Sequence, residues 1–312
     1  MASVDIAIPC YQYGRYLREC VSSVLRQGIA GIRVLIIDNA STDNSVEVAR
    51  QLAAEDTRVD VVAHRTNLGQ QATFNEGVDW AASDYFMVLC ADDLLAPGCL
   101  ARAIGVMERR PDVSFVIGTD VEFTDVQELP NIEARAAAAR WTILAGNEFI
   151  EARCLTYPAF SYATATLVRT SAQKRAGHYR TALPYTNDFE MLLRLALLGP
   201  VAETSAIQGM RRSHTSNMSK RHHQTKTQEL GYRAAAFESF FAKEGHAMSD
   251  ARRLSELAKR SLAARAYWWG LRALFRSDPT SALPLFGYAF RMRPTSVILP
   301  PVGYLLSRRR LG

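Results

Sequence analysis

Short apolar runs and amphipathic segments alternate along the first part of the chain. The runs are rich in β-branched residues and predict strands, whereas segments with apolar residues three or four positions apart predict helices. We expect strands at 5–9, 33–37, 59–63, 85–89 and 113–117, and helices at 15–25, 46–52, 72–82 and 97–107. Strands that alternate with helices imply right-handed crossovers. The pattern therefore predicts an α/β fold with a mostly parallel, Rossmann-like sheet and helices on both of its faces.

The pattern becomes less regular beyond residue 119. We expect helices at 146–155 and 189–198 and strands at 163–168 and 201–210, while 135–140 is open between a short helix and an exposed loop. From Gln228 onward the apolar spacing is helical. The sequence thus predicts an α/β part at 1–219 and a C-terminal helical appendage at 220–312.

Two segments of this appendage carry further signals. Residues 265–294 have the spacing of one tetratricopeptide helix pair, and because an array needs about three such units, we expect a packed helix pair instead. Residues 296–306 are apolar but contain Pro300 and Pro301, and 308–310 are all arginine. This segment is too short to span a bilayer. It fits either shallow insertion at an anionic membrane surface or a last helix packed on the core.

Composition narrows the class of protein. With 48% hydrophobic and 22% charged residues, the chain has the make-up of an ordinary globular protein. Its five cysteines are odd in number and lack a Cys-x-x-Cys pair, which favours a reduced, cytoplasmic setting. We expect no secretory signal, because the opening apolar run contains Asp5, and no membrane span, because no run of about 18 apolar residues occurs. The net charge of +6 is modest, so we expect an anionic ligand at the arginine clusters but no nucleic-acid partner.

Polar side chains follow three of the predicted strands. Asp38, Asn67 and Asp92 each come just after a strand, and the carboxyl ends of parallel strands meet at the edge where open α/β sheets bind ligands. Asp92 and Asp93 could hold a hard divalent cation that bridges two phosphates. The alternative is that this acidic pair only begins the next helix, whose first turn favours acids.

Two later segments also admit two interpretations. Asp188 precedes an apolar helix, where an ordinary N-cap is the alternative to a chemical role. Residues 211–219 are basic and rich in hydroxyl groups, and such a loop can close over phosphates, because guanidinium groups bind phosphate oxygens in pairs. The alternative for this loop is a solvated linker.

Five ordered motifs together resemble a known family. They are Ile6–Tyr11, Ser22–Gln27, Ile36–Asp43, Asn67–Gly69 and Ala91–Asp93. In this order they are similar to the inverting family 2 nucleotide-sugar glycosyltransferases, and the resemblance runs from residue 4 to about 219. It implies the glycosyltransferase A fold, with 1–219 as the catalytic domain and 220–312 as a helical region for a membrane surface or a partner.

The resemblance implies roles for residues of the nucleotide site. Pro9 and Tyr11 would line the nucleotide pocket, and Asp38 would recognise the nucleobase, usually uracil. Asn67 and Gly69 would shape the inner wall of this pocket.

The resemblance also implies a metal ion, Mn²⁺ or Mg²⁺. Asp92 falls on the principal ligand position, with Ala91 and Asp93 as supporting contacts to the donor. Cys90 stands where the family has the first acid of the motif.

The remaining implied roles concern the base and the diphosphate. Asp188 falls on the position of the general base and follows Asn187, which replaces another acid common in the family. Arg212 and His214 would clamp the diphosphate.

The implied reaction moves a sugar from a nucleoside diphosphate donor, usually a UDP-sugar, to a hydroxyl group with inversion. The general base takes the hydroxyl proton while the oxygen attacks the anomeric carbon from the face opposite the leaving group. The family's usual acceptors are saccharides or lipid-linked saccharides of bacterial surface polysaccharides and glycolipids. A cytoplasmic enzyme, peripheral at the inner face of the membrane, would meet such acceptors.

Two other functions remain open at this point. A catalytically degenerate, transferase-like scaffold would explain Cys90 and Asn187, although Asp38, Asp92 and Asp188 are intact. A sugar nucleotidyltransferase would also need a nucleotide site and a metal. It would carry a glycine-rich phosphate loop after the first strand, and residues 10–14 lack one.

Overall fold

The computed structural model describes residues 2–124, 140–156, 166–215, 217 and 225–294. The chain divides into two compact units, and we name them the α/β unit (Met1–Phe149 and Ala159–His214) and the helical unit (Ile150–Pro158 and Thr215–Gly312). The catalytic domain expected at 1–219 stays a prediction, because a compact unit by itself does not test a catalytic role.

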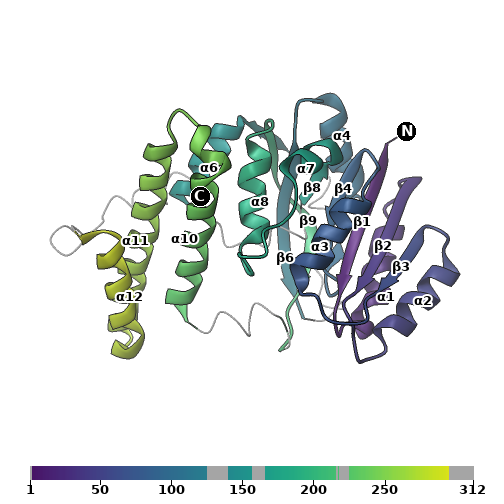
Figure 1. Ribbon diagram of the computed structural model, residues 1–312, viewed down its shortest axis with the longest axis horizontal. Helices are drawn as coiled ribbons and strands as arrows, with labels where there is room; N and C mark the ends of the chain where they lie inside the picture. The colour runs from purple at the N-terminus through teal and green to yellow at the C-terminus, as the bar shows by residue number, and fades with distance from the viewer. Residues whose placement is uncertain (1, 125–139, 157–165, 216, 218–224, 295–312) are drawn as a thin grey trace. The chain divides into compact units, whose positions relative to one another are not determined.

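The α/β unit is built on one sheet (Figure 1). Its described strands are β1 (Ser3–Cys10), β2 (Gly31–Asp38), β3 (Val59–Ala63), β4 (Tyr85–Val88), β5 (Leu94–Leu95), β6 (Phe115–Phe123), β7 (Trp141–Leu144), β8 (Thr166–Arg169) and β9 (Val201–Arg212). The helices up to residue 200 are α1 (Gly14–Leu25), α2 (Ser45–Glu55), α3 (Gln70–Trp80), α4 (Cys99–Arg109), α6 (Gly146–Leu155), α7 (Thr170–Ala176) and α8 (Asn187–Ala196).

The strand order is β3-β2-β1-β4-β8-β6-β9-β5, with β7 paired to β9. Pairing is parallel from β3 to β4 and again between β6 and β9, whereas β8, β5 and β7 pair antiparallel to their neighbours. The predicted α/β class is confirmed, and the sheet is mixed in its second half.

Both faces of the parallel half are covered by helices, as its nearly uninterrupted apolar strands require. On β1, Ile6 and Ile8 pack in one cluster with residues of α1, α2 and α4. Ala7, between them, packs with Phe74 and Val78 of α3 on the opposite face. This alternation with period two places α3 on the face of β1 opposite α1, α2 and α4.

Some boundaries differ from those that the sequence predicts. Helix α4 begins at Cys99, so Pro97 precedes it and is not its first residue. Helix α2 has Asn44 as its N-cap, and Asp43 contributes from outside by accepting a hydrogen bond from the Ser45 N–H at 3.0 Å. The elements β5, β7 and α7 were not predicted, because they have two, four and seven residues and too few apolar repeats. Most of 135–140 lies outside the described residues.

The helical unit contains α10 (Lys226–Ala242), the 3₁₀ turn η2 (Glu244–Ala247), α11 (Ala251–Phe275) and α12 (Pro279–Met292). Thr225 and Gln228 form a capping box at the start of α10. The expected helix pair is α11 with α12, which pack together through Tyr267 and Phe286 with ring centroids 5.5 Å apart. None of the described helices is both long and apolar enough to cross a membrane.

A buried carboxylate joins β1 to the connection that precedes β4. Asp5 is fully buried and accepts hydrogen bonds from Arg33 at 2.7 and 2.8 Å, from the Ala82 and Ser83 N–H groups, and from the Ser83 hydroxyl. Burial alone would raise the pKa of Asp5, but these donors outweigh it, and the net pKa lies below the ordinary value.

We expect Asp5→Ala to lower the free energy of unfolding at pH 7 by about 1–3 kcal/mol, because it strands several donors. Since the folded-state pKa is lowered, the stabilisation by Asp5 is present above the unfolded-state pKa of about 3.9 and disappears as the pH falls through the folded-state value. Urea unfolding at pH 7 and in acid measures both effects. The control is Glu55→Gln, which removes the exposed pair with Arg18 and should change nothing measurable.

Candidate active site

The register of the parallel strands brings several predicted site residues to one edge of the sheet. Cys10 at the end of β1 pairs with Asp38 at the end of β2. On the other side of β1, Ala7 pairs with Val88, the last residue of β4. The segments that leave β1, β2 and β4 therefore start side by side. They contain Tyr11, 43% exposed, and the acidic motif Cys90–Asp93, while the partly buried Pro9 lies near the end of β1 itself.

The loops after β1 and β2 are tied to each other. The Gln12 N–H donates to Ser41 Oγ at 2.9 Å, and the Gly14 N–H donates to Asp43 Oδ2 at 3.3 Å. Gln12 and Ala40 both have left-handed backbone, with φ of 63° and 62°. Such strain persists only where the surroundings over-determine it, and it clusters at functional sites. A Cβ on Gly14 would lie 2.4 Å from Asn44 Oδ1, so only glycine permits this contact between the loops.

Asp38 has one satisfied and one unsatisfied carboxylate oxygen. Its side chain is fully buried, and Oδ2 accepts a hydrogen bond from the Ser41 N–H at 2.9 Å. Oδ1 is buried and has no hydrogen-bond partner in the part of the chain that the structure describes. A buried carboxylate oxygen without a donor is costly, and a ligand N–H group would satisfy it.

Asn67 is positioned by a residue that the sequence analysis did not single out. Asn39 donates from Nδ2 to Asn67 Oδ1 at 3.0 Å and accepts the Leu68 N–H at 2.8 Å. Asn67 Oδ1 also accepts the Gly69 N–H at 2.9 Å. Gly69 has φ of 87°, a conformation that favours glycine, and is the N-cap of α3. Asn39 thus holds the 67–69 turn against the end of β2.

A histidine and a glutamate complete this arrangement. His64 Nδ1 lies 3.2 Å from Asn39 Oδ1, and His64 Nε2 lies 2.6 Å from Glu76 Oε2 on α3. We call Asn39, His64, Asn67 and Glu76 the wall network. In the sequence, Asn39 could be noticed because it belongs to the same motif as Asp38. His64 and Glu76 have no local signal, because His64 contacts Glu76 and Asn39 across 12 and 25 residues of the chain.

The acidic motif gathers three ligand-type side chains. One ligand atom each of Cys90, Asp92 and Asp93 lies within 4.8 Å of the others. The Arg212 N–H donates to Asp93 Oδ1 at 2.9 Å, and Arg212 Nε donates to the Asp92 carbonyl oxygen at 3.1 Å. His214 Nε2 lies 3.1 Å from Asp92 Oδ2. The structure thus brings the predicted residues Asp92, Asp93, Arg212 and His214 into one cluster.

This cluster fits a hard divalent metal ion. The carboxylates of Asp92 and Asp93 are the oxygen ligands that Mn²⁺ and Mg²⁺ prefer, and two of them leave coordination positions for water and phosphate. The sulfur of Cys90 is a softer donor that these ions do not favour. Burial, together with the charges of Asp93 and Asp92, raises the pKa of Cys90 well above its usual range, so its thiol keeps its proton.

Arg212 is placed differently from a flexible phosphate clamp. It is the last residue of β9, its side chain is only 7% exposed, and it forms an ion pair with Glu19. Its guanidinium carbon lies 4.6 Å from the ring centroids of Tyr16 and of Phe123. Arg211, also in β9, pairs with Asp120 and Glu122. His214 is the predicted clamp residue that lies past the strand, and its ring centroid lies 5.1 Å from that of Tyr16.

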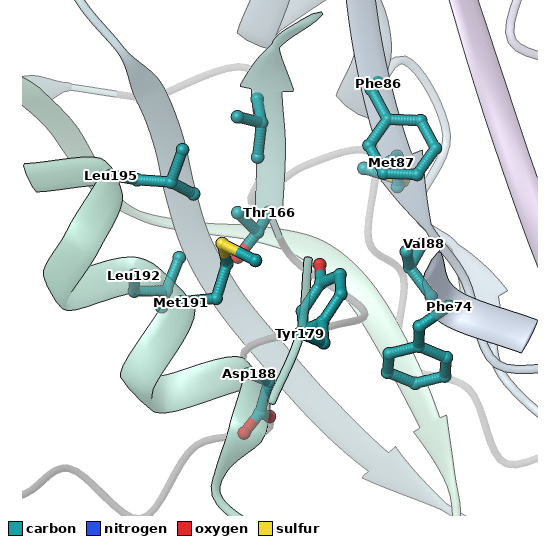
Figure 2. A pocket seen from close by; sticks show the side chains of 11 residues that line it. Phe74, Phe86, Met87, Val88, Thr166, Tyr179, Asp188, Met191, Leu192 and Leu195 are labelled. Atoms are coloured by element: carbon teal, nitrogen blue, oxygen red, sulfur yellow. The ribbon is translucent and has the colours of Figure 1, made fainter. Parts of the chain in front are cut away.

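Asp188 lies in the first turn of α8, at the end of a small cavity (Figure 2). Thr186 is the N-cap of this helix, so Asp188 is not, although its Oδ1 accepts the Phe189 N–H at 2.6 Å. The cavity holds about 20 Å³, room for one water molecule, and is lined mostly by apolar side chains, among them Phe74, Tyr179 and Met191. This burial raises the pKa of Asp188 to about 6, against the lowering effect of two backbone N–H groups.

Asp188 also lies near the acidic motif. Its charge contributes to the raised pKa of Cys90, and Val88 at the end of β4 lines the same cavity. The preceding Asn187 donates nothing from its buried Nδ2 to any described group, while its Oδ1 accepts the Asp188 N–H at 2.9 Å. Asp188 and Val88, at the end of β4, therefore line one cavity.

Helix α8 is held by an internal ion pair that explains an arginine in an apolar helix. Arg194 is 4% exposed and pairs with the fully buried Glu190, which also pairs with Arg180. Arg194 Nη2 donates to the His178 carbonyl oxygen at 2.8 Å. Asn75 of α3 holds the same segment, because it exchanges two hydrogen bonds with the Tyr179 backbone. These contacts fix the start of α8 relative to α3.

The first half of the chain is similar in sequence to a known protein family. The sequence model described as glycosyl transferase family 2 matches residues 5–172. The glycosyltransferase GlyG of Streptococcus pneumoniae serotype 4 is 29% identical over 115 residues, which cover 37% of this chain and 38% of that relative. The match to such relatives therefore covers well under half of their length.

Solved structures resemble a larger part of the chain. S. aureus TarS 1–349 in complex with UDP-GlcNAc has a TM-score of 0.60 at 12% identity and covers 91% of this chain and 89% of its own. The mannosyltransferase PcManGT of Pyrobaculum calidifontis, in complex with GDP-Man and Mn²⁺, has a TM-score of 0.57 at 14% identity over 94% and 86%. These likenesses confirm the predicted glycosyltransferase A type of fold. Since the family model matches more than half of its length, the chain belongs to glycosyl transferase family 2.

Proposed function

We propose that this chain transfers a sugar from a nucleoside diphosphate donor, a UDP-sugar, to a hydroxyl group of an acceptor with inversion at the anomeric carbon. The observation that carries the proposal is Asp188, a carboxyl group with a pKa of about 6 that lies beside the acidic motif and at the edge of the sheet. A group of this kind is a general base that is mostly ionised at neutral pH and still basic enough to accept a proton.

The proposed site divides the donor between two groups of residues. Asp38 Oδ1, buried and unpaired among the described residues, supports recognition of a nucleobase N–H, which uracil offers. Pro9, Tyr11 and the wall network around Asn67 and Gly69 would line the nucleoside. In support, the TarS structure that resembles this chain holds UDP-GlcNAc.

Asp92 and Asp93 would hold Mn²⁺ or Mg²⁺ next to the diphosphate, with Ala91 as a backbone contact. When bound, such an ion stabilises the negative charge that develops on the leaving group. His214, 3.1 Å from Asp92, would turn toward the diphosphate or the ion, while Arg212 keeps the acidic motif in place. In the transfer step, Asp188 takes the proton of the acceptor hydroxyl, the oxygen bonds to the anomeric carbon, and the nucleoside diphosphate leaves from the opposite face.

The acceptor belongs to the same proposal. The acceptor would be a saccharide or lipid-linked saccharide of a surface polysaccharide or glycolipid, used on the cytoplasmic side. It would contact the segment 120–185 and reach Asp188; part of this segment lies outside the described residues.

A panel of nucleotide sugars with Mn²⁺ tests the function. We expect slow hydrolytic release of nucleoside diphosphate from one preferred donor, a UDP-sugar, and loss of this release on metal chelation. Mass spectrometry of the product mixture measures both. Release of pyrophosphate from a nucleoside triphosphate and a sugar phosphate would indicate the nucleotidyltransferase instead. Absence of binding to every donor would favour the degenerate scaffold.

Asp188→Asn should lower turnover by about 10²–10⁴-fold, since general-base catalysis is worth that much, and should leave donor affinity unchanged. Because burial raises the pKa of Asp188 and the ionised form is the base, wild-type kcat should rise with pH through about 6 and level off above it. Initial rates against pH, with isothermal titration of the donor, measure these effects.

The control for this substitution is Asp79→Asn, because Asp79 is an exposed carboxylate that pairs with His178. It should leave turnover and its pH profile as in the wild type. Near-normal turnover by Asp188→Asn would show that another group is the base.

His64→Ala should weaken UDP binding about tenfold, because the loss of about 1–1.5 kcal/mol per hydrogen bond loosens Asn39 and the 67–69 turn. The value of kcat at saturating donor should change little, since His64 lies away from the reacting atoms. Titration calorimetry with UDP and steady-state kinetics separate the two parameters.

His178→Ala is the matched control. His178 also bonds a carboxylate of α3, Asp79 at 2.8 Å, but both side chains are exposed and neither belongs to the wall network. If both histidine variants bind UDP as the wild type does, the wall network does not position the nucleotide.

A further inference from the structure

The turn between α11 and α12 exposes large apolar side chains. Leu274 and Phe275 end α11, and Leu283 lies in the second turn of α12; they are 45%, 88% and 69% exposed. Elsewhere on this helix pair, apolar side chains such as Leu262 and Leu285 are buried. We call residues 271–283 the hairpin tip. An exposed phenylalanine between exposed leucines is an unusual surface for a globular protein and calls for a partner.

The hairpin tip is a defined structure and not a frayed end. Three residues, Arg276 to Asp278, join the helices, and the Ser277 and Asp278 N–H groups donate to carbonyl oxygens at the end of α11. Asp278 caps α12 by accepting from the Ser281 N–H at 3.0 Å and the Thr280 hydroxyl at 2.7 Å. Figure 1 shows the two helices side by side, so Phe275 and Leu283 lie at the same end of the pair.

Charge around the exposed apolar residues has one dominant sign. Arg272 and Arg276 flank Phe275 on either side and are both exposed. The one acid of the hairpin tip, Asp278, is engaged as the cap of α12. Exposed aromatic and aliphatic side chains between arginines are typical of segments that bind the surface of a membrane with anionic lipids.

We propose that the hairpin tip docks on the surface of an anionic lipid bilayer. Phe275 and Leu283 enter the boundary between headgroups and acyl chains, and Arg272 and Arg276 bind lipid phosphates. Stable attachment takes two signals, and the hairpin tip combines exposed apolar side chains with basic ones. This docking does not depend on which sugar, if any, the α/β unit transfers.

Flotation of the full-length protein with phosphatidylcholine vesicles, with and without phosphatidylglycerol, tests the proposal. Wild-type protein should float with the anionic vesicles, and the double variant Phe275→Ser, Leu283→Ser should bind them about tenfold or more weakly, from the lost burial of two apolar side chains. Arg272→Gln and Arg276→Gln should each lower binding to anionic vesicles about fivefold and leave binding to neutral vesicles unchanged. Leu197→Ser, a change of an exposed leucine in the α/β unit, is the control and should float as the wild type.

A dye attached at the tip reports its surroundings directly. In Phe275→Cys labelled with an environment-sensitive fluorophore, emission should shift to the blue on addition of anionic vesicles and stay constant with neutral ones. Wild-type protein treated in the same way corrects for label on the native cysteines. Unaltered flotation of the double variant would overturn the proposal. So would a dye already shielded without vesicles, or a change of oligomeric state in the double variant during sedimentation, because the tip would then be covered by protein.

Discussion

The candidate site depends on the contact between the end of β9 and the acidic motif after β4. Arg212 reaches Asp92 and Asp93, 120 and 119 residues earlier in the chain, through its own N–H and its guanidinium group. The ion pair with Glu19 of α1 and the rings of Tyr16 and Phe123 keep this guanidinium group in place. Three distant parts of the chain are therefore joined at one point. Loss of this contact would loosen the last residue of β9 and His214 beside the acidic motif, although β5 would still pair with β9.

The parallel half of the fold could be predicted from sequence because its information is local. The strands at 5–9, 33–37 and 59–63 are mostly apolar, and each is followed by a helix with apolar residues at helical spacing. The structure places β1, β2 and β3 within a few residues of these expectations. The short antiparallel strands β5 and β7 gain their stability from pairing with β9, and no period within two or four residues could indicate that.

The same distinction holds for the candidate site. Asp38, Asn67 and Asp92 could be chosen from sequence, because each is a polar residue just past an apolar strand. Asn39 and His64 could not, because the role of each lies in a side-chain contact with a distant residue. For Arg212, the role of clamping the diphosphate stays a prediction, but its burial could not be predicted, because a basic residue before a polar loop suggests an exposed side chain. In the structure, the side chain of Arg212 is buried at the edge of the sheet.

Three aspartates of the candidate site have different surroundings, and this difference is the strongest physical argument for assigning them different roles. Asp38 is enclosed and keeps one oxygen for a donor that the described chain does not supply, which suits recognition. Asp92 is held by a histidine and lies beside a second carboxylate, which suits a cation. Asp188 faces an apolar cavity that favours its protonated form and raises its pKa to about 6. A carboxyl group whose burial brings its pKa toward neutrality is suited to acid–base chemistry, and Asp188 is such a group.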